Sequence, residues 1–68
     1  MVNKAIIDAR KKKGLTQQEL ADKLGISKGM VSMLESGERT GTAKMMSKYA
    51  DYFGITVDAL FFADKGNN

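Results

Sequence analysis

Apolar and polar positions along the chain predict five short helices. Within each segment the apolar residues fall three or four positions apart, which places them on one face of a helix. The expected helices cover residues 3–13, 17–24, 28–36, 43–53 and 57–62. No alternating strand pattern, internal repeat or low-complexity linker interrupts them. The pattern therefore predicts one all-α domain over residues 1–63, a compact five-helix bundle, followed by a flexible tail over residues 64–68.

The stretch over residues 15–37 predicts two helices joined by a tight turn. Thr16 and Glu19 have the spacing of a capping box, so the first helix should start directly after Thr16. Gly25 should end it, because glycine adopts the left-handed conformation without steric cost. Ser27 can then cap the second helix. A helix-turn-helix of this kind places its second helix in the major groove of DNA.

The same spacing selects a candidate core. Its expected members from the first four helices are Ile6, Ala9, Leu20, Ala21, Leu24, Val31, Leu34, Met46, Tyr49, Ala50 and Phe53. Ile55, Leu60 and Phe61 are expected to close this core. Phe61 and Phe62 are adjacent and differ by about 100° around a helix. Both can hardly be fully buried in so small a domain, so one phenylalanine is expected at the surface.

Composition excludes several classes of function. The 68 residues include no cysteine and no histidine, which excludes disulfides, zinc fingers, thiol nucleophiles and imidazole bases. The carboxylates are scattered singly and no glycine-rich loop has a phosphate-loop ending, so we expect no enzyme. No apolar run approaches the roughly 20 residues of a membrane span, and no secretory leader is apparent, so the expected location is the cytoplasm.

The charge distribution favours a polyanionic partner. The formal net charge is +3. Residues 1–36 carry seven basic and four acidic side chains, whereas residues 37–68 carry four of each. The positive excess therefore lies in the half of the chain that contains the predicted helix-turn-helix.

The order of these segments resembles the Xre/Cro/CI family of bacterial and phage repressors. Residues 18–21 and 24–27 are similar to the second helix and turn of that family. Residues 31–37 resemble its third helix and exit, and residues 50–60 its final helices. The resemblance covers about residues 4–62. It implies a lambda-repressor-like fold, dimeric operator binding and transcriptional control.

The resemblance also implies a set of DNA contacts. They fall on Gln17, Ser27, Lys28, Gly29, Ser32, Met33, Arg39 and Thr40. Gln17 would bond a phosphate, and Lys28 and Ser32 would donate to bases or phosphates. Met33 departs from the family, which more often has a long polar side chain there, and offers apolar contact to a thymine methyl. Gly29 also departs from the family, since it has no side chain. The alternative to a DNA-facing surface here is an ordinary exposed helix with one suboptimal residue.

An ion pair between Arg10 and Glu35 is implied by the same resemblance. Arg10 follows Ile6 by four residues and therefore faces inward, and Glu35 adjoins the apolar Leu34. We interpret the pair as architectural, because it would orient the recognition helix. The basic run over residues 11–13 is expected to be a solvated helix end.

The predicted function is that of a sequence-specific transcriptional regulator, a repressor that binds a palindromic operator in double-stranded DNA as a homodimer. Tyr52, Phe61 and Phe62 are the expected dimer interface. No cofactor, metal or small-molecule effector is expected. One alternative is the antitoxin of a toxin–antitoxin pair. Another is a helical protein–protein adaptor, in which Met30 and Met33 would form the partner-binding patch.

Overall fold

Five helical elements follow one another in the structure, a computed structural model that describes residues 2–62. They are α1 (Lys4–Lys12), α2 (Gln17–Leu24), α3 (Lys28–Ser36), α4 (Ala43–Phe53) and η1 (Asp58–Phe62), a short π-helix. No strand occurs within the described residues. The predicted all-α five-helix fold is confirmed. The predicted tail over residues 64–68 lies outside the described residues, as does the predicted domain end at residue 63.

Side-chain oxygens cap α1, α2, α3 and α4, and the caps at Thr16 and Ser27 are those predicted from the sequence. Thr16 Oγ1 accepts from the Glu19 N–H at 3.1 Å, and the Thr16 N–H donates to Glu19 Oε1 at 2.8 Å, which completes the capping box of α2. Ser27 and Thr42 accept from backbone N–H groups of the first turns of α3 and α4, each at 3.1 Å. Asn3 does the same for α1 at 3.2 Å. Each cap satisfies a backbone donor that the helix itself leaves unpaired.

The turn after α4 corrects one prediction about the core. Gly54 is left-handed, with φ of 66°, and the next N–H, that of Ile55, donates to the Ala50 carbonyl at 3.2 Å. This turn leaves the Ile55 side chain 39% exposed. The prediction that Ile55 closes the core is therefore wrong, because the backbone of the cap directs this residue toward the surface.

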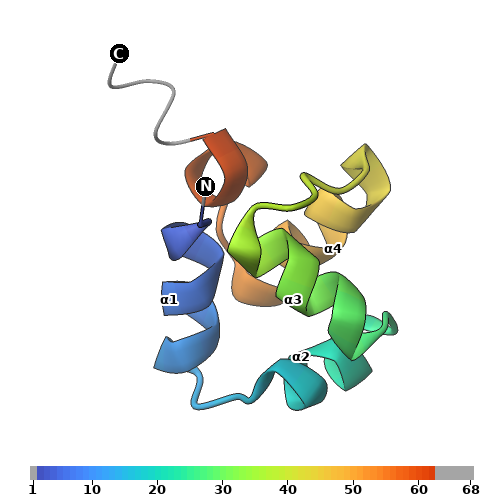
Figure 1. The fold of residues 1–68 in the computed structure, drawn as a ribbon. Coiled ribbons are helices and arrows are strands. Elements are labelled where there is room, and N and C mark those ends of the chain that lie inside the picture. The colour runs from blue at the N-terminus through green and yellow to red at the C-terminus, as the bar shows by residue number, and fades with distance from the viewer. Residues whose placement is uncertain (1, 63–68) are drawn as a thin grey trace.

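The core draws side chains from every helix. Its buried members are Ile6, Ala9, Leu20, Ala21, Leu24, Val31, Leu34, Tyr49 and Leu60. In Figure 1, α3 crosses the middle of the bundle, and it packs against both α1 and α2. η1 packs against α1, and α2 against α4. Phe61 packs against this core, as predicted, with its ring edge-on to Tyr49 at 5.6 Å between ring centres.

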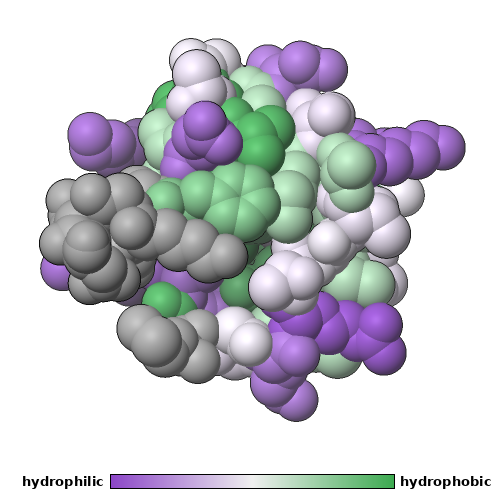
Figure 2. Space-filling model, turned by 90° about the horizontal axis from the view of Figure 1, so that it is seen from above, coloured by the Kyte–Doolittle hydropathy of each residue, from purple (hydrophilic) through white to green (hydrophobic). Residues whose placement is uncertain are grey.

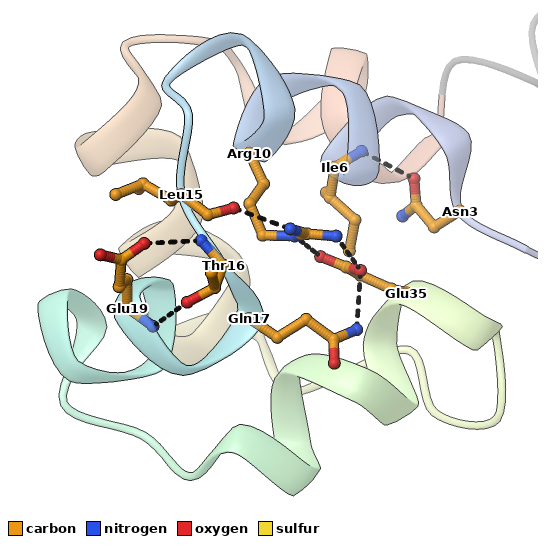
Figure 3. A network of polar contacts seen from close by, with 8 residues as sticks. All are labelled: Asn3, Ile6, Arg10, Leu15, Thr16, Gln17, Glu19 and Glu35. Carbon is orange, nitrogen blue, oxygen red and sulfur yellow. Dashed lines mark hydrogen bonds and ion pairs between the residues drawn. The ribbon is translucent and has the colours of Figure 1, made fainter.

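Glu35 ties three parts of the bundle together (Figure 3). Arg10 donates through Nε to Glu35 Oε2 at 2.7 Å and through Nη2 to Glu35 Oε1 at 3.1 Å. Gln17 Nε2 also donates to Glu35 Oε1, at 3.0 Å. The remaining guanidinium nitrogen, Nη1, donates to the Leu15 carbonyl at 2.8 Å. The expected ion pair is thus present, and it links α1, α2 and α3.

This ion pair is shielded from solvent. The Arg10 and Glu35 side chains are only 13% and 5% exposed. The hydrogen bond to Glu35 raises the pKa of Arg10, against the opposing effect of desolvation. A backbone hydrogen bond also reaches Glu35, because the Asn3 N–H donates to the Glu35 carbonyl at 2.9 Å. The end of α3 is therefore hydrogen-bonded both to the start of α1 and to its last turn.

Tyr49 places a hydroxyl in the interior without a partner. Its side chain is fully buried, and no residue in the described part of the chain hydrogen-bonds its Oη. Burial raises the pKa of the Tyr49 hydroxyl, and the negative charge of Glu35 raises it further. The hydroxyl therefore stays protonated and carries the free-energy cost of an unpaired buried polar group.

We predict that Arg10→Met lowers the free energy of unfolding by about 3–5 kcal/mol, because Glu35 is left as an uncompensated buried charge. A domain of this size rarely has more than about 3–5 kcal/mol in total, so the variant should be largely unfolded at 25 °C. Thermal melts of Arg10→Met, Glu35→Leu and the double variant measure the effect.

The double variant should recover much of the loss, because a buried ion pair replaced by apolar side chains is often neutral. Lys11→Met is the matched control, since it removes a cation from the exposed side of the same helix turn. Strictly additive losses in the two single variants would show that Arg10 and Glu35 do not interact.

Tyr49→Phe should leave the free energy of unfolding unchanged or raise it by up to about 1 kcal/mol, since it removes an unpaired buried hydroxyl and keeps the ring. Tyr52→Phe is the control, because Tyr52 is only half-buried. Urea unfolding curves provide the measurement. A clear loss of stability in Tyr49→Phe would mean that this hydroxyl is hydrogen-bonded in solution.

Candidate nucleic-acid interface

The side of α3 that faces away from the core forms a candidate interface. The inner side of α3, which faces the core, is marked by the buried residues Val31, Leu34 and Glu35. Because successive residues of a helix turn by about 100°, the opposite side is fixed by those three. We call this side the outward face of α3, and it consists of Gly29, Ser32, Met33 and Ser36. All of these are exposed except Met33, which is half-buried.

The N-terminal end of α3 adds two polar side chains to this face. Lys28 is exposed at the first position of α3, so its long side chain can reach into the solvent beside the outward face. Ser27 is exposed as well, and its Oγ accepts from the Met30 N–H at 3.1 Å. The hydroxyl of Ser27 can still donate its hydrogen while it caps the helix. The structure therefore brings Ser27, Lys28, Gly29 and Ser32 together at one surface.

Gln17 takes a position that the sequence did not indicate. It is the first residue of α2 and is half-buried, with its amide turned to Glu35. A side-chain amide has two N–H bonds, so one remains after the bond to Glu35. A contact between Gln17 and a phosphate stays a prediction. In such a contact, Gln17 would bind the phosphate and the Glu35 carboxylate at the same time.

The loop between α3 and α4 flanks the outward face. Arg39 and Thr40 are exposed in this loop. The Arg39 N–H donates to the Met33 carbonyl at 3.2 Å, which holds the loop against the end of α3. The exposed Glu38 carboxylate accepts from Ser36 Oγ at 3.2 Å and places a negative charge beside Arg39.

Gly41 is a residue of this loop that sequence reasoning missed. Its φ is +81°, and a Cβ built on it would lie 3.0 Å from Leu34 Cδ2. A side chain at this position would therefore strain the backbone and press on the core. The signal in the sequence is a glycine between two threonines in a polar loop. Gly41 also helps to line an open hollow beside α3, together with Met30, Glu38, Arg39, Thr40, Thr42 and Met45.

The basic end of α1 carries three exposed lysines, one of which lies beside an aromatic ring. Lys11, Lys12 and Lys13 are exposed in the last turn of α1 and at its cap. Lys13 Nζ lies 5.3 Å from the centre of the Tyr52 ring, a cation–π distance. This contact engages one cation of the run with an aromatic ring of α4.

The expected dimer residues lie near the C-terminal end of the described chain. Tyr52, Phe61 and Phe62 are each half-buried, so neither phenylalanine is fully exposed. Tyr52 packs edge-on against Phe53, with 5.2 Å between ring centres. Seen from above, green hydrophobic surface lies among purple hydrophilic side chains at this end of the molecule (Figure 2). A dimer interface at these three residues stays a prediction.

Neither a metal-binding cluster nor a membrane-spanning helix is found within residues 2–62. Residues 2–62 contain no group of three or more acidic, histidine or cysteine side chains placed to hold a metal ion. None of the helices in this part of the chain has the length and apolar character needed to cross a membrane.

Comparison with known proteins identifies the family. The family described as helix-turn-helix matches residues 6–60. An uncharacterized HTH-type transcriptional regulator of Methanocaldococcus jannaschii is 36% identical over 47 residues, which cover 69% of this chain and 71% of the relative. One of Archaeoglobus fulgidus is 34% identical over 59 residues, covering 87% of this chain and 84% of the relative.

A putative multi-protein-binding factor 1 of Yarrowia lipolytica is 43% identical over 54 residues, which cover 79% of this chain but only 36% of that relative. No solved structure matches the chain at a significant level. The match over residues 6–60 spans α2, the turn and α3. The chain thus belongs to the helix-turn-helix family of transcriptional regulators, of the Xre/Cro/CI type.

Proposed function

We propose that this regulator acts as a repressor that binds a palindromic operator as a homodimer, with one α3 in the major groove of each half-site. The observation that carries the proposal is the division of α3 into two sides. Its inner side holds the buried Glu35, and its other side exposes Gly29 and Ser32, with Lys28 at its start. Occupation of the operator would then block the promoter.

Three contacts support a rigid presentation of α3 to DNA. The Asn3 N–H bonds the Glu35 carbonyl, Arg10 binds the Glu35 carboxylate, and Gln17 donates to the same carboxylate. A helix held from two neighbours loses little further freedom when it enters the groove, so less binding free energy is spent on ordering it. The ion pair therefore acts in DNA binding by positioning the helix.

Gln17 would couple phosphate binding to base recognition. It starts α2, and the free N–H groups of a helix N-terminus favour an anion. The second N–H of its amide would donate to a phosphate while the first stays on Glu35. Through this residue, the position of the DNA backbone would be fixed relative to α3. Arg39 and Thr40 would add backbone contacts from the loop.

A homodimer would match the symmetry of a palindromic operator. We place its interface at Tyr52, Phe61 and Phe62, because these aromatic side chains are only half-buried in the single chain. Two-fold symmetry brings the same patch of both subunits together, so each side chain contributes twice. The two α3 helices should then lie about 34–36 Å apart, one turn of the DNA.

Protein binding is a second candidate function. The hollow beside α3 has Met30 and Met45 in its lining, and methionine adapts to irregular partner surfaces. The name of the Yarrowia relative, a putative multi-protein-binding factor, agrees with this candidate. A regulator that uses this hollow would recruit a protein to DNA or would act as an adaptor without DNA.

Selection of bound duplexes from a random library tests DNA binding, specificity and operator symmetry together. A repressor dimer should return a motif with two inverted half-sites, and its affinity should fall steeply as salt is raised. Transcription from a promoter that contains the motif should fall when the protein is added. Failure to bind any duplex at low salt would contradict the proposed repressor function and would leave protein binding as the candidate function.

Lys28→Ala should weaken binding to the selected operator by about 1–3 kcal/mol if Lys28 donates to a base. If Lys28 touches only phosphate, the loss should be similar for all sequences and the salt slope should fall by about one. Fluorescence anisotropy over a salt series distinguishes the two. Lys12→Ala is the control, since it removes another exposed cation, from the end of α1. Equal affinity of Lys28→Ala and the native chain would remove Lys28 from the interface.

Phe62→Glu should leave the chain folded but weaken self-association. In a two-fold dimer the substitution replaces an apolar side chain in both subunits and brings two negative charges to the same interface. Sedimentation without DNA measures the association, and titration of a two-half-site operator should lose its cooperativity. Ala43→Glu, at the exposed start of α4, controls in the DNA-free sedimentation for the added negative charge. If Phe62→Glu dimerises like the native chain, the interface lies elsewhere.

A further inference from the structure

Two residues of the outward face of α3, Gly29 and Met33, have almost no side-chain hydrogen-bonding capacity. Gly29 lies close to the point opposite the buried side of the helix, and Met33 follows one turn later. Glycine contributes no side chain, and a methionine thioether is only a weak acceptor. Neither residue can form the paired hydrogen bonds by which arginine, asparagine or glutamine side chains distinguish base pairs. Recognition at these two residues therefore depends on shape and apolar contact.

The fold gives no reason for glycine at position 29. A Cβ built on Gly29 would have a single neighbour within 4 Å, Ser27 Oγ at 3.9 Å, and its φ is not in the left-handed region. Alanine would therefore fit at this second position of α3, and it should stabilise the helix because glycine loses more backbone entropy on folding. The absence of a side chain is explained if a molecule outside the chain approaches the helix at this point.

Met33 borders the space that Gly29 leaves open. Residues four positions apart are neighbours on a helix surface. The backbone at Met33 is held in place, because its carbonyl accepts from Ser36 Oγ and from the Arg39 N–H, each at 3.2 Å. Its side chain is half-buried, so part of the thioether chain remains accessible. An apolar side chain thus lies one turn from a position that has none, and we call the surface at these two residues the Gly29–Met33 notch.

We propose that the Gly29–Met33 notch receives the 5-methyl group of a pyrimidine in the major groove. This group is the apolar feature that base pairs present there, and apolar side chains recognise it by contact. Lys28 and Ser32, both exposed beside the notch, supply the polar contacts around it. The inference rests on the proposed DNA-binding function and names the chemical feature of the operator that α3 recognises.

Replacing thymine by deoxyuridine in the selected operator removes the methyl group and leaves every hydrogen bond of the base pair intact. At one position of a single half-site, this replacement should weaken binding about four-fold, the effect of one apolar carbon group returned to water. Replacing both symmetric positions should weaken binding about 15-fold in a dimer. Deoxyuridine at thymines outside the α3 contact should change nothing.

Variants of the notch provide the matched controls. Met33→Leu keeps an apolar side chain and should keep the preference for thymine over deoxyuridine, whereas Met33→Gln should lose it and select different bases. Gly29→Ala should fold with a higher melting temperature and yet bind the thymine operator more weakly, because the added methyl group fills the notch. Lys28→Ala should weaken binding to both operators by the same factor.

Cytosine and 5-methylcytosine at the same position identify the source of the methyl group. Tighter binding of 5-methylcytosine than of cytosine would assign the notch to the methyl group on either base. A preference for thymine over deoxyuridine without that effect would assign it to thymine. Equal affinity for thymine and deoxyuridine at every position of a bound operator overturns the inference. Absence of binding to any duplex overturns the proposed function itself.

Discussion

The buried carboxylate of Glu35 is the interaction on which the arrangement of the other helices depends. A lone charge in the interior would be very unfavourable, so the chain must bring donors to it. Arg10 comes from α1 and Gln17 from α2, and Figure 3 shows both converging on Glu35. A shift of α1 or α2 away from α3 would take a donor from this carboxylate. The pair thus constrains how α1 and α3 are placed, and removing one partner alone is what destabilises the fold.

Local chemistry made most of the fold predictable. The capping box of Thr16 and Glu19, and the glycines that follow α2 and α4, act within a few residues of themselves, so the sequence alone locates the helix boundaries. Ile55 was misassigned because its apolar character says nothing of the left-handed turn at Gly54 that directs it outward. The pattern of Asp58–Phe62 suggested an ordinary helix, whereas the structure has a π-helix.

The candidate site was less accessible to sequence reasoning. The outward face of α3 follows from helical phase, which places Lys28, Gly29 and Ser32 correctly at the surface. The bond from Gln17 to Glu35 joins residues 18 positions apart and depends on how α2 and α3 meet. The unpaired hydroxyl of Tyr49 is likewise a property of the assembled core. Features that require two helices to be placed relative to one another need the three-dimensional structure.

The shortness of the helices has a consequence for the lifetime of the protein. None of them exceeds the 11 residues of α4, and isolated helices shorter than about 12–15 residues are marginal in water. Helices and core must therefore form together, so loss of the core exposes the whole backbone to proteases. A bound ligand that requires the folded state lowers the population of that open form. Copies of a regulator with this architecture that occupy a site should therefore be degraded more slowly than free copies, which would lengthen the period of control beyond the average lifetime of the chain.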